Sequence, residues 1–118
     1  MISTIDGRRG LVLTRLIGPV TEAEVEDHNH RLGIDPQFKP YYKQLVDLSE
    51  LTEILYDSAA VRDTAQRHVF LPGVKRALVA FNEAAYGMSR MFATQSESAG
   101  QNIRVFRDMA SAEEWLDA

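Results

Sequence analysis

Serine, histidine and carboxylate side chains are the groups of this 118-residue sequence that could perform chemistry, and Ser58 is the first to consider. It follows Asp57 where a helix is expected to begin, a position that suits a helix cap, a phosphorylated serine or a nucleophile. A phosphate there would meet free backbone N–H groups and could pair with Arg62, although Asp57 would repel it. Because Asp and Ser are preferred caps, we expect Asp57 or Ser58 to cap the helix. We interpret Ser58 as a cap first and a phosphoacceptor second.

A set of residues for nucleophilic catalysis or metal binding is not visible. The segment Gly87–Met91 lacks the second glycine of a nucleophile elbow, and its serine, Ser89, falls inside an expected helix. His28 and His30 are two residues apart and point to nearly opposite sides of a helix, which does not suit a shared metal. His68 falls on an apolar stripe, where a hydrogen-bonded core or rim histidine is the usual case. We therefore expect no catalytic residue, no metal, no cofactor and no enzyme activity.

The expected helix at residues 83–96 carries the features most typical of a binding surface. Gly87 inside a helix costs about 1 kcal/mol relative to alanine, and close approach of a backbone or a ligand is the usual compensation. Tyr86 and Arg90 are four residues apart and share a face, and both residue types are enriched at binding hot spots. Because apolar residues at helical spacing usually form the core, packing of Met88, Met91 and Phe92 on the sheet is the first interpretation, and a binding surface flanked by Tyr86 and Arg90 is the second. The candidate interaction residues are Asp57, Tyr86, Gly87, Arg90 and Met91.

Apolar runs and turn residues predict strands alternating with helices. Strands are expected at residues 2–6, 11–17, 41–48, 77–81 and 103–106, and helices at about 21–31, 58–70, 83–96 and 111–116. Gly18-Pro19 should end the second strand, and Thr21 with Glu24 predicts a capping box. Trp115 and Leu116 should hold the last helix on the sheet. The order ββαβαβαβα predicts one α/β domain over residues 1–118, with a mixed, mostly parallel sheet of about five strands, an N-terminal hairpin and about four helices.

Composition excludes several classes of protein. The sequence has 13 Lys and Arg against 17 Asp and Glu, for a net charge of −4, and its basic residues form only small groups such as Lys75-Arg76. Nucleic-acid binding would need a clustered basic face, so we do not expect it. There is no cysteine, and no apolar run approaches the ~20 residues of a membrane span or the pattern of a signal peptide. We expect a cytoplasmic protein.

Three segments resemble the STAS group (sulfate transporter and anti-sigma factor antagonist domains), in particular its small SpoIIAA-like branch. They are Val46–Ser49 followed by Asp57–Ala59, Ala77–Ala80 leading into Tyr86–Phe92, and Ile103–Asp108 followed by Trp115-Leu116. The resemblance implies a STAS-like domain that binds partner proteins, in some members under control of a phosphorylated serine. That acceptor falls here on Ala59, which has no hydroxyl, and Ser58 would replace it only with a register shift of one. A few relatives hold nucleotides or lipidic molecules.

Two functional hypotheses follow. The first is a non-enzymatic protein-interaction module with an unknown protein partner, self-associating as a homodimer through an exposed apolar patch. The alternative is a binding protein for an apolar, lipidic or nucleotide-like ligand, held between the sheet and the helices starting near Ser58 and Tyr86. The loops at residues 47–57 and 82–85 are its expected location, because ligands of open α/β sheets lie beyond the carboxyl ends of strands. Such a carrier should show an enclosed pocket on the order of 300 Å³ or more.

Overall fold

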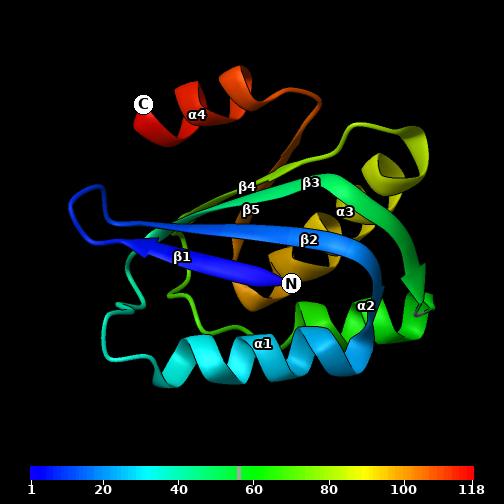
Figure 1. The fold of residues 1–118 in the computed structure, drawn as a ribbon, viewed down its shortest axis with the longest axis horizontal. Helices are drawn as coiled ribbons and strands as arrows, with labels where there is room; N and C mark the ends of the chain where they lie inside the picture. Colours follow the sequence, from blue (N-terminus) through cyan, green and yellow to red (C-terminus); the bar gives the residue numbers. More distant parts are fainter. Residues whose placement is uncertain (56) are drawn as a thin grey trace.

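Strands and helices alternate along the chain, and the computed structural model describes them for residues 1–55 and 57–118 (Figure 1). The strands are β1 (Ile2–Asp6), β2 (Leu11–Thr21), β3 (Lys43–Leu55), β4 (Lys75–Val79) and β5 (Asn102–Phe106). The helices are α1 (Glu22–Ile34), α2 (Ser58–Ala65), α3 (Glu83–Ser96) and α4 (Met109–Asp117), with a 3-10 turn at Glu97–Ala99. The predicted order ββαβαβαβα is confirmed. No helix in this described part is long and apolar enough to cross a membrane.

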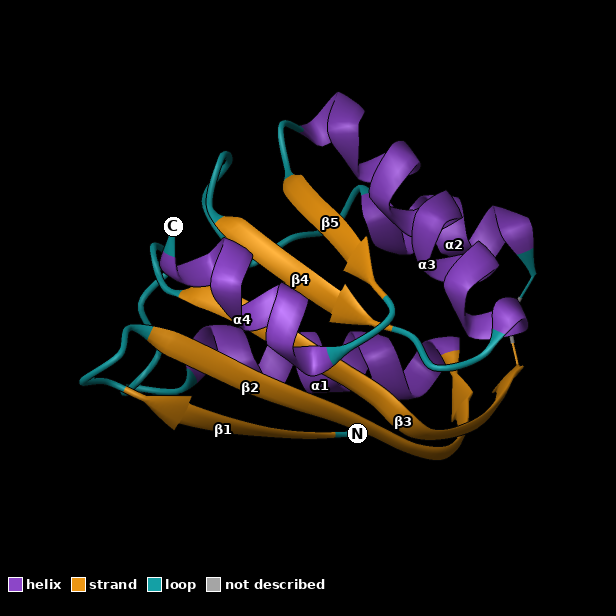
Figure 2. Cartoon of the chain, turned by 90° about the horizontal axis from the view of Figure 1, so that it is seen from above, coloured by secondary structure: helices purple, strands orange, loops and turns teal. Residues whose placement is uncertain are grey.

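The strands form one sheet in the order β1-β2-β3-β4-β5. β1 and β2 are an antiparallel hairpin in which Ile2 lies opposite Arg15, and the other neighbouring strands are parallel. Each parallel connection steps to the next strand in the same direction, so crossovers of one hand place their helices on one face. Helices α1, α2 and α3 accordingly cover one face of the sheet, and α4 covers the other (Figure 1 and Figure 2).

Alternating side chains of the parallel strands supply the core on both faces. Leu45 and Ala77 point to the α4 face, where they pack with Ala112 and Leu116. Their neighbours Val46 and Leu78 point to the three-helix face, as expected for strands whose side chains alternate. Leu116 is buried and Trp115 packs beside it, which confirms the predicted packing of the last helix. The strand expected to include Phe81 ends at Val79, and the Phe81 side chain is exposed.

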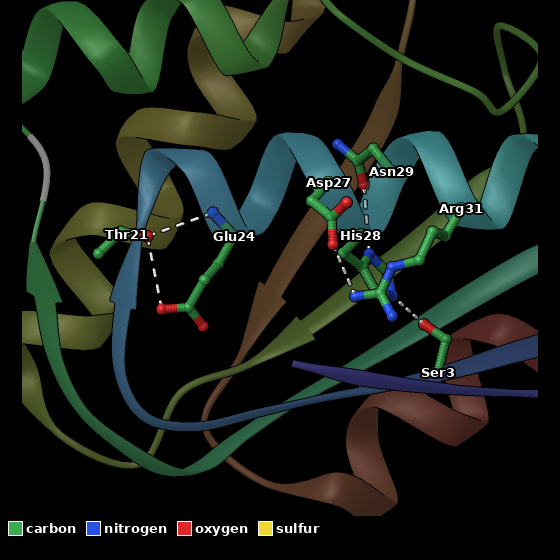
Figure 3. Close-up of polar contacts among 7 residues, drawn as sticks. All are labelled: Ser3, Thr21, Glu24, Asp27, His28, Asn29 and Arg31. Carbon is green, nitrogen blue, oxygen red and sulfur yellow. Dashed lines mark hydrogen bonds and ion pairs between the residues drawn. The ribbon is translucent and has the colours of Figure 1, made fainter.

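Helix α1 begins as predicted. The Thr21 backbone is extended, and its hydroxyl oxygen accepts a hydrogen bond from the Glu24 N–H at 3.2 Å. The Glu24 carboxylate accepts from the Thr21 hydroxyl at 3.4 Å (Figure 3). Asn82 caps α3 in the same way through the Ala85 N–H, at 2.8 Å. Each cap satisfies a backbone N–H group that the first helical turn leaves free.

The ribbon formed by β2 and β3 extends beyond the rest of the sheet, which corrects two predicted strand ends. Gly18 does not end β2. Its φ of +68° is accessible to glycine, and register shifts on either side of it bend the strand while pairing with β3 continues. β3 runs to Leu55 rather than Leu48, although it pairs with β4 only as far as Asp47. The free end of the ribbon bends toward α2 (Figure 1 and Figure 2).

Helix α2 is shorter than the predicted span of residues 58–70. It ends at Ala65, and the next N–H, of Gln66, bonds to the carbonyls of Asp63 and Thr64 in a tight final turn. The chain then forms a loop that carries Phe70 into an edge-to-face contact with Phe38, with ring centroids 5.3 Å apart. This aromatic contact belongs to a small core cluster with Val12. Packing in that cluster outweighs the helical periodicity of the sequence.

Candidate ligand cavity

A cavity of about 100 Å³ lies between the sheet and the three helices that cover this face. Its apolar lining comes from β2, β3 and β4 and from all three helices, and includes Leu16, Val25, Val46, Leu48, Leu51, Val61, Leu78, Met88 and Phe92. The polar lining residues are Asn29, Gln44, Thr64, Arg76 and Ser89. The partly exposed lining residues, which mark the rim, are Met1, Asn29, Ile54, Met88 and Phe92. Gln44, Thr64, Arg76 and Ser89 are buried, so the cavity has a buried polar end and a partly exposed, mostly apolar rim.

Strand register explains this polarity. Gln44 pairs with Arg76 at the start of the parallel strands, and Val46 pairs with Leu78 two residues further along. Since residues two apart on a strand share a face, all four side chains point to the three-helix side. Along the two strands, the polar pair Gln44–Arg76 therefore lies before the apolar pair Val46–Leu78, which places polar and apolar side chains at different ends of the cavity. Leu51, on the ribbon beyond the sheet, continues the apolar wall.

Arg76 is the unusual residue of this cavity. It is 8% exposed, and its guanidinium donates through Nε to Gln44 Oε1 and through Nη1 to Gln101 Oε1, both at 3.0 Å. Nη1 also donates to Nδ1 of His68 at 3.0 Å. The guanidinium carbon lies 4.6 Å from the centroid of the Phe70 ring. Burial lowers the pKa of Arg76 to about 10, which leaves the side chain positively charged at neutral pH.

Two other polar atoms at this end are buried without a hydrogen-bond partner among the described residues. They are Oγ1 of Thr64 and Nε2 of His68. Because His68 Nδ1 accepts from Arg76, the proton of the neutral ring resides on Nε2. Burial, together with the positive charge of Arg76, lowers the pKa of His68 to about 4, so the ring is neutral at pH 7. His68 therefore hydrogen-bonds to the guanidinium without compensating its charge.

A hydrogen-bonded chain continues from Gln44 across the sheet. Its Nε2 donates to Thr14 Oγ1 at 2.9 Å, so its amide oxygen is oriented toward Arg76. Thr14 Oγ1 lies 2.8 Å from Ser3 Oγ, which in turn lies 2.5 Å from Nε2 of His28 on α1 (Figure 3). The chain fixes the Gln44 amide and ties β1 to α1.

The Ser3–His28 contact is a serine–histidine pair that sequence reasoning did not identify. Burial lowers the pKa of His28, and its Nδ1 lies 3.4 Å from Asn29 Oδ1. However, Ser3 lies on the edge strand β1 rather than at a strand-to-helix turn, and Thr14 shares its hydroxyl. We interpret this pair as a structural contact. The described residues contain no group of three or more His, Cys, Asp or Glu side chains placed to hold a metal.

At the start of α2, Asp57 rather than Ser58 caps the helix. Asp57 is the cap, because its backbone is extended and its carboxylate accepts from the Ala60 N–H at 2.9 Å. Ser58 is already the first helical residue and its side chain is exposed, so its predicted role as the cap is wrong. Its phosphorylation stays a prediction. Neither residue lines the cavity.

The other four predicted residues lie on α3. The Tyr86 ring stacks under Arg107, whose guanidinium carbon is 3.8 Å from the ring centroid. Arg90 is exposed and Met91 is partly buried. Gly87 is exposed, and a Cβ added there would meet no atom within 4 Å beyond its chain neighbours and the backbone of its own helix, so the close approach expected at this glycine is absent from the described structure. Met88 and Phe92, rather than Met91, line the cavity.

The buried cavity residue that the sequence analysis missed is Arg76, which it treats as part of the small basic pair Lys75-Arg76. A signal was present. Arg76 precedes the apolar run Ala77–Ala80, and it shares a strand face with Leu78 and Ala80. A run that is apolar on both faces predicts a buried strand. Extending that predicted strand by one residue toward the N-terminus includes Arg76 and places its positive charge in the core.

Comparison with solved structures finds a similar fold in an uncharacterized protein of the DUF3478 family from Shewanella loihica PV-4, described as having a SpoIIAA-like fold. The TM-score is 0.59 and the sequence identity 17%, over 90% of this chain and 83% of that one. No protein-family model and no curated protein matches the sequence. At this identity the likeness establishes the fold alone. The SpoIIAA-like fold expected from the resemblance is confirmed.

Proposed function

We propose that this protein is a non-enzymatic binding domain that holds a small, largely apolar molecule between its sheet and helices α1, α2 and α3. The cavity lined by Leu16, Val46 and Leu78 carries the proposal. A ligand that occupies this space of about 100 Å³ would bury the apolar walls of the cavity, which favours binding. This proposal is the alternative hypothesis of the sequence analysis, and the cavity is smaller than the pocket of about 300 Å³ or more that was expected there for such a carrier.

The cavity also limits the ligand. Its volume of about 100 Å³ is below the ~300 Å³ of sites that enclose drug-sized molecules. An apolar cavity of about 150 Å³ is enough to hold benzene. The enclosed part of the ligand is therefore a small ring or a short branched chain, and any longer part extends past Met1, Ile54 and Met88 at the rim.

Native mass spectrometry of the protein purified from its own cells, compared with its intact mass after denaturation, tests the proposal. We expect a mass excess that disappears on denaturation. Ser89→Leu should fill the cavity from α3 and remove that excess, because Ser89 is a buried lining residue. Thr94→Leu, at an exposed position of the same helix, is the matched control and should retain it. The bare mass would contradict ligand binding, and a covalent gain of one phosphate would support a switch at Ser58 instead.

A protein-interaction module is the second candidate, and a feature at the carboxyl ends of the strands favours it. A groove of about 340 Å³ lies between the β2–β3 ribbon and the start of α3, lined by Leu51, Thr52, Glu53, Ile54, Asn82, Ala84, Ala85 and Met88. Two exposed apolar side chains belong to the same loops, Leu55 at 48% and Phe81 at 50% exposure. The sequence analysis expected a small-molecule ligand, rather than a protein partner, at residues 47–57 and 82–85, and both segments contribute to this groove. Concentration-dependent association of the purified protein would support this candidate.

A further inference from the structure

We infer that the ligand of this cavity is a small organic acid whose carboxylate binds Arg76. The inference rests on the proposed function and specifies the chemistry of the ligand. An amphipathic acid fits the two ends of the cavity, because its carboxylate matches the buried polar end and its hydrocarbon part matches the apolar walls. Three features of Arg76 favour such a ligand: its positive charge, its free donors and the absence of a counter-charge within the described residues.

Among the described residues, the hydrogen-bond partners of the buried guanidinium are all neutral. They are the amide oxygens of Gln44 and Gln101 and the neutral ring of His68. The ion pairs found among residues 1–55 and 57–118 are Arg15–Glu50, Asp27–Arg31, Glu26–Arg67 and Glu83–Arg107, all of them exposed. Buried charges in proteins are normally paired, since removing an ion from water costs several kcal/mol. An anion from outside the chain would supply the missing pair.

The free donors point to a carboxylate. An arginine has five N–H donors. The Nε donor and the two Nη1 donors of Arg76 are used by Gln44, His68 and Gln101, whereas Nη2 has no hydrogen bond to the described residues and keeps some solvent access. Thr64, at 6% exposure, lines the same cavity with an unpartnered hydroxyl. A carboxylate accepts several hydrogen bonds through its two oxygens, so it can satisfy both groups.

The apolar walls argue against a bare inorganic anion. Val46, Leu48 and Leu78 line the cavity next to the polar end. A fully hydrated ion would leave these walls without contacts, whereas the alkyl or aryl group of an acid would bury them. A neutral analogue would fill the walls but leave the guanidinium unpaired. The site should therefore discriminate strongly between an acid and its amide.

The test uses refolded, ligand-free protein and measures thermal stabilisation and calorimetric affinity. The probes are isovalerate, hexanoate and benzoate, each beside its neutral amide, with chloride and phosphate at matched ionic strength. We expect at least one acid to bind, with its amide about tenfold to a hundredfold weaker, the range of one charge-assisted contact. This comparison uses the wild-type chain and does not depend on any variant folding.

Two variants locate the carboxylate. Arg76→Met removes the charge at similar length and should lose the preference for acids. Because it leaves the acceptors on Gln44, Gln101 and His68 without their donor, we expect it to be less stable than the wild type, and its binding is measured well below its own melting temperature. Thr64→Val should weaken acid binding several-fold and leave amide binding unchanged. Arg62→Met, at an exposed position on α2, is the control and should bind acids like the wild type.

The outcomes separate the two proposals. If amides bind as tightly as acids, or Arg76→Met keeps the acid preference, the inference is wrong and the proposed function stands. If chloride or phosphate alone stabilises the protein as much as the acids do, the anion is inorganic and the inference is also wrong. If neither acids nor amides bind, the inference and the proposed function both fail.

Discussion

At the scale of a single residue, the lowered pKa of His68 predicts how the stability of the protein depends on pH. The pKa of His68 is about 4 in the folded protein and 6.5 in the unfolded chain, so the folded state binds fewer protons between these values. The stability that depends on the neutral ring is therefore complete above pH 6.5 and is lost as the pH falls toward 4. His68→Gln keeps an acceptor for Arg76 but does not titrate. We expect this variant to lose less stability than the wild type between pH 6.5 and 4, measured by urea unfolding of ligand-free protein.

His30 provides the matched control, because its side chain is exposed on α1. His30→Gln should follow the wild-type profile. His28, whose pKa burial also lowers, will leave part of the acid sensitivity in the His68 variant. Equal acid sensitivity of the wild type and His68→Gln would show that His68 does not carry the predicted linkage.

The sequence predicts single residues well only where chemistry and position leave one choice. Asp57 and Ser58 are both good caps by type, and only the extended backbone at Asp57 decides between them. Arg76 is missed for a different reason. An arginine side chain is normally exposed. Arg76 is buried because β4 begins before the apolar run, and the run alone does not show where the strand begins. The partners Gln44 and Gln101 are distant in sequence, so only the fold brings them to the guanidinium.

At the scale of an element, the packing of helix α4 predicts the effect of a core substitution on stability and on ligand affinity. The helix packs on the sheet face opposite the cavity, where Leu116 contacts Leu11, Leu45 and Ala77 in one cluster. Leu116→Ala should lower the free energy of unfolding by about 2–4 kcal/mol, the usual range for a buried leucine. Chemical denaturation measures this loss. Acid affinity, measured well below the melting temperature, should be unchanged because the sheet separates α4 from Arg76. A large change in affinity would show that the two faces are coupled.

Element boundaries were predictable where local signals agree. The bounds of α3, Glu83–Ser96, match the prediction, since Asn82 provides a cap and the helical residues follow without a break. Gly18-Pro19 predicts a strand end, but in the structure it bends β2 instead, and β2 stays paired with β3 beyond it. Both outcomes are compatible with a Gly-Pro dipeptide in a strand. The end of α2 depends on the packing of Phe70 against Phe38, a contact that no local pattern contains.

At the scale of the whole molecule, the exposed surface is that of one compact globular chain. The chain exposes 6468 Å², and a monomer of 13.3 kDa is expected to expose about 6450 Å². Its radius of gyration of 13.0 Å is also close to the ~13.5 Å of a single compact domain. Self-association, if it occurs, should therefore be reversible and concentration-dependent rather than required for folding.

Arg90→Glu tests self-association through α3. Arg90 is exposed and four residues from Tyr86, whose ring lies between α3 and Arg107. In a two-fold dimer the same patch meets itself, so one substitution alters the contact twice and should weaken association about tenfold or more. Sedimentation equilibrium over a range of concentrations measures this change. Arg62→Glu, which makes the same charge change on the exposed face of α2, should associate like the wild type. If Arg90→Glu melts far below the wild type, Arg90 has a structural role. If Arg90→Glu and Arg62→Glu associate equally, the surface around Arg90 and Tyr86 is not the site of self-association.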